Sequence, residues 1–106
     1  MKKILSQLEI DKFKQDGAIF LKNKFNVSWI NKLQKGIERD IKNPSPRFKS
    51  HTVKKNVPAY LEDYWTWHLV SEFKDFVFNS PYAQIASELM SAKKINLVMD
   101  NWFLRE

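Results

Sequence analysis

The last segment of the chain, Lys94 to Glu106, constrains the possible fold more than any other. Its apolar residues occupy both faces of an extended strand: Ile95, Leu97, Met99 and Phe103 on one face, and Val98, Trp102 and Leu104 on the other. A strand that is apolar on both faces needs cover on both sides and, as a rule, a neighbour at each edge. With a length of about 11 residues it belongs to a sizeable sheet. We therefore expect the sequence to stop where the sheet of a larger protein begins.

The composition is that of a small folded domain. At 106 residues the chain is at most one domain, and its apolar fraction of 43% and aromatic fraction of 14% are sufficient for a core. The absence of cysteine excludes disulfides, zinc–thiolate sites and thiol nucleophiles. The N-terminus lacks the apolar region of a signal peptide, and no run approaches the roughly 18 apolar residues of a membrane span. We expect a soluble, cytoplasmic protein.

The net charge of +6 is concentrated in the first half of the chain. Residues 1–55 carry 14 Lys/Arg and 5 Asp/Glu, a balance of +9, whereas residues 56–106 carry 4 and 7, a balance of −3. Such a basic half can attract phosphate, whether in nucleic acid or in an acyl-CoA. Lysines scattered over solvated helix faces are the favoured interpretation, and nucleic acid is the less favoured partner.

Residues 43–59 are the one stretch in which apolar residues follow neither helix nor strand periodicity. The stretch contains three prolines and is rich in basic residues. At about 17 residues this basic loop exceeds ordinary connections. It is either a disordered lysine-rich connection or a loop that meets an anionic substrate.

The remaining sequence predicts four helices and a short strand. Ser6 and Glu9 form a capping box for a helix from about 7 to 16 that buries Ile10 and Phe13 and ends at Gly17. A short strand is expected at 18–21. The second predicted helix is capped by Asn26 or Ser28, runs to about Lys42 and has an apolar stripe of Ile30, Leu33, Ile37 and Ile41. The other two are a helix over 72–79 capped by Ser71 and one restarted by Ser80-Pro81 that runs to about Met90.

Catalytic motifs are missing from the chain. The two histidines, His51 and His68, are not followed two places later by Asp or Glu, as the first half of a 2-His-1-carboxylate iron site would require. A site built from both histidines with Asp63 or Glu62 would need unrelated segments to converge, and we do not expect it. With glycine at only two positions there is no phosphate-cradling loop either.

Three sequence segments, in the same order along the chain, resemble those of a known family. Phe13 to Leu21 looks like an opening F-x-x-D-G-(apolar) step from helix to strand, and Phe73 to Met90 is similar to a segment with an S-P-x-A-x-x-A-x-x-L-M helix. Val98 to Glu106 is similar to a D-x-x-(apolar)-(apolar)-K-E strand. Together the chain resembles the N-terminal portion of the phytanoyl-CoA dioxygenase family of Fe(II)- and 2-oxoglutarate-dependent oxygenases. Ser91 stands where glycine is common in the family.

The resemblance implies an α+β fold: the N-terminal helices and first strands of a double-stranded β-helix (jelly roll), with most of the β-core and all iron ligands missing from residues 1–106. The whole protein would hydroxylate a small or lipid-like (acyl) substrate with Fe(II) and 2-oxoglutarate, and this chain alone would be inactive and bind neither. Family members commonly place a lysine that contacts 2-oxoglutarate where this chain has Arg105. By the same analogy Asp100 and the aromatic run Tyr64 to Trp67 border the pocket, although core packing is the favoured role of the rings.

Two other functional hypotheses remain. A free-standing basic module would bind nucleic acid or an acidic partner through residues 42–55 in a salt-sensitive way. A pure interaction domain would fold stably without binding iron or 2-oxoglutarate.

Overall fold

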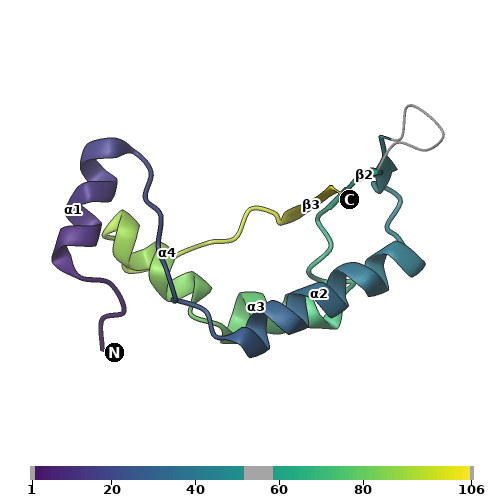
Figure 1. The fold of residues 1–106 in the computed structure, drawn as a ribbon. Helices are drawn as coiled ribbons and strands as arrows, with labels where there is room; N and C mark the ends of the chain where they lie inside the picture. Colours follow the sequence, from purple (N-terminus) through teal and green to yellow (C-terminus); the bar gives the residue numbers. More distant parts are fainter. Residues whose placement is uncertain (1, 52–58, 106) are drawn as a thin grey trace.

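The computed structural model describes residues 2–51 and 59–105, and these form an α+β fold of four helices and one three-stranded antiparallel sheet (Figure 1). None of these helices is long and apolar enough to cross a membrane. The helices are α1 (Gln7–Asp16), α2 (Val27–Lys42), α3 (Ser71–Asn79) and α4 (Tyr82–Met90), and the strands are β1 (Lys49–Ser50), β2 (Tyr60–Tyr64) and β3 (Asn101–Arg105).

Local signals in the sequence set the ends of the first two helices. Ser6 accepts a hydrogen bond from Glu9 N–H at 3.1 Å, and the Glu9 carboxylate accepts Ser6 N–H at 2.9 Å, so the predicted capping box is confirmed. Gly17 ends α1 with a left-handed φ of 77°, a conformation that glycine adopts without steric cost. Asn26 caps α2 by accepting Trp29 N–H at 3.2 Å.

The strand predicted at 18–21 is wrong. The segment is irregular, no described strand pairs with it, and the Phe20 side chain is 80% exposed. An apolar run forms a strand only where another strand supplies hydrogen-bond partners, and the chain here instead connects α1 to α2. Phe13, expected to be buried, is half-buried, whereas Ile10 is buried as predicted.

The later helices begin close to the predicted residues with different caps. Ser71 is the first residue of α3 rather than its cap, and its hydroxyl donates to Glu72 Oε1 at 3.0 Å. Val70 precedes α3 and makes no capping hydrogen bond, because its side chain is aliphatic. That side chain is buried in the core. Pro81, rather than Ser80, occupies the N-cap position of α4, which begins at Tyr82, although Ser80 Oγ accepts Tyr82 N–H at 3.2 Å.

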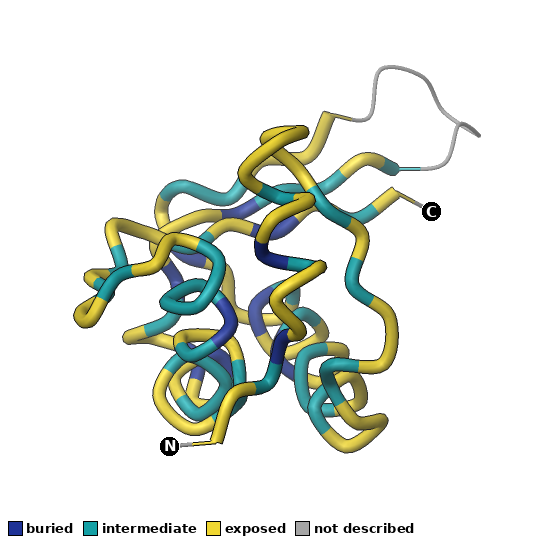
Figure 2. Tube along the Cα trace, turned by 90° about the vertical axis from the view of Figure 1, so that its left-hand side faces the viewer, coloured by how far each residue is buried: buried dark blue, intermediate teal, exposed yellow. Residues whose placement is uncertain are grey.

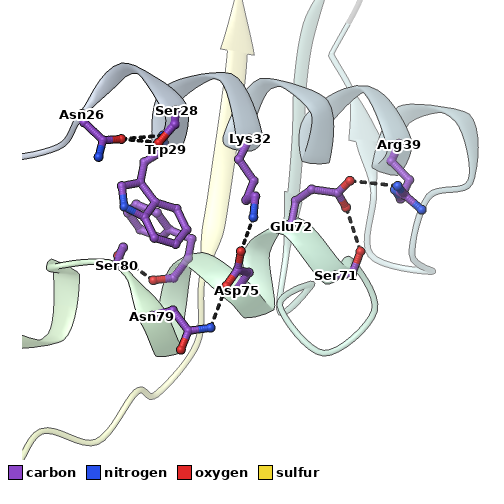
Figure 3. A network of polar contacts seen from close by, with 11 residues as sticks. Asn26, Ser28, Trp29, Lys32, Arg39, Ser71, Glu72, Asp75, Asn79 and Ser80 are labelled. Carbon is purple, nitrogen blue, oxygen red and sulfur yellow. Dashed lines mark hydrogen bonds and ion pairs between the residues drawn. The ribbon is translucent and has the colours of Figure 1, made fainter.

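Helices α2 and α3 run antiparallel and side by side (Figure 3). Two ion pairs join their solvent-facing sides, Lys32 with Asp75 and Arg39 with Glu72, the second at 2.8 Å. Between them Gly36 is buried against the ring of Phe73: a Cβ at Gly36 would lie 2.5 Å from Phe73 Cε1. Gly36, a glycine in the interior of α2, therefore permits the two helices to approach closely.

The sheet has the order β1-β2-β3, and alternate residues point to opposite faces. Asp63 is opposite Trp102 and Leu61 opposite Leu104 on the face towards α2 and α3. The other face, which we call the open face, carries Tyr60, Glu62, Tyr64, Phe103 and Arg105. Lys49 and Ser50 pair with Glu62 and Leu61, so the basic loop expected over 43–59 is partly strand; Lys54 and Lys55 lie outside the described residues.

Two separate hydrophobic clusters hold the elements together. Leu5, Ile10 and Ile85 join the N-terminal segment and α1 to α4. The second cluster joins α2 and α3 to the sheet and has as its buried members Val70, Phe73 and Trp102. Figure 2 shows that fully buried positions lie inside the molecule and are few beside the exposed ones.

The described chain is more extended than a compact domain of this length. Its radius of gyration is 16.1 Å, and its extents are 48 × 27 × 25 Å. A compact chain of this size has a radius of gyration of about 13 Å. Surfaces that a compact domain would cover are therefore accessible to water.

The strand expected over Lys94 to Glu106 is regular only in its second half. Residues 94–100 approach β3 without strand pairing, and β3 pairs with β2 alone, so within the described residues its outer edge has no partner. Val98, Met99 and Phe103 are 88%, 55% and 54% exposed. The sequence of this segment predicts cover on both faces and a neighbouring strand at each edge. The described residues do not provide all of these contacts.

Candidate functional site

The open face gathers aromatic and polar side chains from all three strands. Tyr60 stacks on Phe103 with ring centroids 6.1 Å apart, and the His51 ring lies 5.5 Å from that of Tyr60. His51 Nε2 lies 3.2 Å from Glu62 Oε1. Helices α2 and α3 pack on the opposite side of the sheet, so this face is open to a ligand or another polypeptide.

Arg105, the residue singled out by the family resemblance, ends β3 on this open face. Its backbone is fixed opposite Tyr60, and its side chain is exposed. The guanidinium makes no hydrogen bond or ion pair with another side chain of the described residues. Because guanidinium donors match a carboxylate in a bidentate fashion, an accessible arginine in this position is suited to an organic acid.

A groove of about 310 Å³ lies on the other side of the sheet, between the helices and the segment that leads into β3. Its walls come from α2, α3 and the start of α4, and its polar lining includes Asp100 and Asn101. The apolar and aromatic residues that line it are Leu33, Ile37, Phe73, Phe76, Val77, Tyr82, Leu97, Met99 and Trp102.

Asp100 organises the turn that follows β2. Its carboxylate accepts hydrogen bonds from Thr66 Oγ at 2.7 Å, from Thr66 N–H at 3.1 Å and from Trp67 N–H at 3.1 Å. Its carbonyl oxygen accepts Trp65 N–H at 2.7 Å. Asp100 thus lines the groove on the helix side of the sheet, and its carboxylate is occupied in holding the turn.

The aromatic run from Tyr64 to Trp67 divides between core and surface. Trp67 packs in the second hydrophobic cluster, which agrees with the favoured core role. Tyr64 and Trp65 are 38% and 51% exposed, and the Arg47 guanidinium lies 5.7 and 5.2 Å from their ring centroids. Arg47 also donates to the carbonyl oxygens of both residues, so it is bound to the turn.

Two carboxyl groups meet in the layer between α2 and the sheet. Asp40 and Asp63 expose 1% and 0% of their surfaces, and their carboxyl groups hydrogen-bond to each other. Trp102 Nε1–H donates to Asp40 Oδ2 at 3.0 Å. Ser45 Oγ–H and Tyr64 N–H donate to Asp63 Oδ1 at 2.6 and 2.8 Å.

The surroundings shift the pKa values of Asp40 and Asp63 in opposite directions. Burial raises the pKa of Asp40 to about 7, and the neighbouring Asp63 adds to the shift. Burial also acts to raise the pKa of Asp63, but hydrogen bonds from Asp40 and Ser45 outweigh it and hold that pKa below its usual value. The pair therefore carries one proton, held on Asp40, at pH values between the two pKa values.

The sequence missed Asp40 and its partners, although a signal was present. Asp40 is three residues beyond Ile37, which places a carboxyl group on the apolar stripe of α2. A charged residue at a core position is almost always paired, so the position of Asp40 indicates that it has a buried partner. It does not indicate which residue that partner is.

Of the histidines and carboxylates considered in the sequence, only His51 and Glu62 come together in the described structure. His51 contacts Glu62 on the open face, whereas His68 packs beside Trp65 and Trp67, and Asp63 lies buried on the opposite side of the sheet. Within the described residues no group of three or more His, Cys, Asp or Glu side chains is placed to hold a metal ion.

Comparisons of the chain with known protein families, with curated proteins and with solved structures find no match.

Proposed function

We propose that residues 1–106 form the N-terminal part of an Fe(II)- and 2-oxoglutarate-dependent dioxygenase similar to the phytanoyl-CoA dioxygenase family. In this proposal the helices and the three strands are the beginning of a jelly roll. The open face of the sheet would line the interior of that jelly roll and face a small or acyl substrate.

One observation carries the proposal: the sheet is covered on one face by helices and is open on the other face and along β3. A jelly roll needs this arrangement, because its second sheet packs on the face that helices leave free and its further strands extend the open edge. The exposed apolar residues Val98, Met99 and Phe103 are the contact surface that such strands would cover.

The two cofactors fit the chain differently. A 2-oxoglutarate carboxylate suits Arg105, whose exposed guanidinium on the open face makes no hydrogen bond or ion pair with another described side chain. Iron does not fit, because the described residues bring no ligand group together. The proposal therefore requires the iron ligands to be supplied by polypeptide beyond these residues, and it assigns no step of the reaction to this chain alone.

The alternative of a nucleic-acid-binding module receives less support. Arg47, in the middle of the basic segment 42–55, is bound to two backbone carbonyl oxygens and two aromatic rings of the turn after β2. Phosphate binding would have to break these contacts.

The test is to read the gene past the codon for Glu106 and to express the complete product. We expect a frame that continues and encodes His-x-Asp and a later histidine, and a purified product that converts 2-oxoglutarate to succinate when Fe(II) is added. Arg105→Gln should raise the KM for 2-oxoglutarate about tenfold or more, as expected for the loss of a charged hydrogen-bond pair.

Two matched variants sharpen the test. Arg105→Lys keeps the charge and should recover most of the affinity, and Lys94→Gln removes an exposed cation before β3 and should leave the KM unchanged. A frame that lacks the histidines, or a complete product that turns over no 2-oxoglutarate, would refute the proposal.

A further inference from the structure

Asp40 and Asp63 join α2 to β2 through a contact that needs a proton. Carboxylate oxygens only accept hydrogen bonds when both groups are ionised. A hydrogen bond between the two carboxyl groups therefore requires that one of them keep its proton. The rest of the pair is fixed by donors: Trp102 from β3 binds Asp40, and Ser45 binds Asp63.

Within the described residues the surroundings supply no cation to replace that proton. Asp100, the charged group near the pair from the segment before β3, is itself acidic and acts against ionisation of Asp40. The arginines closest in sequence are engaged elsewhere: Arg39 with Glu72, and Arg47 with the turn after β2. Loss of the proton would leave two buried negative charges in contact, with a third close by.

The position of the pair connects its protonation to the apolar groove. Asp40 is on the same helix as Leu33 and Ile37, which form one wall of the groove, and its partner Trp102 also lines the groove. A separation of α2 from the sheet would widen the groove and expose its lining.

We infer that Asp40 and Asp63 form a proton-dependent clasp that holds α2 against the sheet in acid solution and loosens as the pH rises to neutral. The clasp is independent of the dioxygenase proposal, since it uses residues on the helix side of the sheet and none on the open face.

The test is amide hydrogen exchange of the chain as a function of pH, corrected for the intrinsic exchange rate. A carboxyl group that titrates near 7 when folded and at its ordinary value of 3.8 when exposed changes the opening equilibrium about thirtyfold between about pH 5.5 and about pH 8.5. We expect amides of β2 and β3 to lose protection by that factor in the wild-type chain.

Two substitutions separate the clasp from general effects of pH. Asp40→Asn carries an amide that donates to Asp63 and accepts from Trp102 at every pH, so protection in this variant should not change with pH. Asp11→Asn, on the exposed surface of α1, should keep the wild-type pH dependence.

A second measurement does not depend on a variant that folds. Carbon-13 NMR of the wild-type aspartate carboxyl groups should show one of the pair titrating near neutral pH and its partner in the acid range. Titration of both groups below about pH 5, or an Asp40→Asn variant with wild-type pH dependence, would overturn the inference.

Discussion

Replacing Gly36 by alanine tests how closely α2 and α3 pack. In a solvated helix the change is stabilising by about 1 kcal/mol, because glycine is a poor helix former. Here the new Cβ would lie 2.5 and 2.9 Å from two ring carbons of Phe73, against an ordinary carbon–carbon contact of about 3.5–4.0 Å. The two effects oppose each other, and their magnitudes decide whether Gly36→Ala raises or lowers the free energy of unfolding.

The steric effect should be the larger of the two. Overpacking a core costs about 1–3 kcal/mol, and the upper end applies because the Phe73 ring is buried and cannot swing into solvent. Subtracting the gain in helix propensity leaves a net loss of about 2 kcal/mol in the free energy of unfolding. For a domain of this size that corresponds to a fall in Tm of roughly 10 °C.

Thermal unfolding followed by circular dichroism measures the change, and a double-mutant cycle identifies its cause. Lys35→Ala, at an exposed position of the same helix, should leave Tm nearly unchanged. In a Phe73→Leu background the clash is absent, so Gly36→Ala should there raise stability by about 1 kcal/mol. A rise in Tm for Gly36→Ala in the wild-type chain would show that the helices have room to separate.

Three further predictions concern the buried polar groups. The free energy of unfolding should fall between about pH 4 and about pH 7 in urea titrations, by at most about 4 kcal/mol, because folded Asp40 keeps a proton that the unfolded chain releases over this range. The lowered pKa of Asp63 acts in the opposite direction, at pH values below its ordinary pKa. Trp102→Phe removes the indole donor to Asp40 and should cost about 1–3 kcal/mol in urea unfolding at pH 6, and more at pH 8. Asp100→Ala leaves the fully buried Thr66 hydroxyl without its acceptor; it should cost about 1–3 kcal/mol and increase hydrogen exchange at the amides of residues 65–67.

The helices could be predicted from the sequence because their determinants are local. The capping residues Ser6 and Asn26 and the terminating Gly17 act within a few residues of the helix ends that they fix. The strands could not be predicted as well, since strand formation depends on a distant partner. Residues 18–21 have an apolar pattern but no partner, while Tyr60–Tyr64 became β2 by pairing with a segment about 40 residues further on.

The candidate sites show the same division between local and distant information. The side of the sheet on which Arg105 lies follows from the alternation along β3, once the helix-facing side is known. The meeting of Asp40 with Asp63 depends on how α2 crosses the sheet, and the role of Gly36 depends on where Phe73 arrives from another helix. Neither the partner of Asp40 nor the residue that packs on Gly36 can be identified from a short window of sequence.

The open edge of β3 determines how this polypeptide should behave in concentrated solution. Among the described residues no strand pairs with this edge, so its amide and carbonyl groups, next to the exposed Val98 and Phe103, are a template onto which a second chain can add by forming intermolecular β-structure. Lys93 and Lys94 precede this segment and act as charged gatekeepers, but they stand only at its beginning. Produced by itself, the polypeptide should therefore aggregate as its concentration rises, and a covering strand or a chaperone that binds β3 should suppress the aggregation.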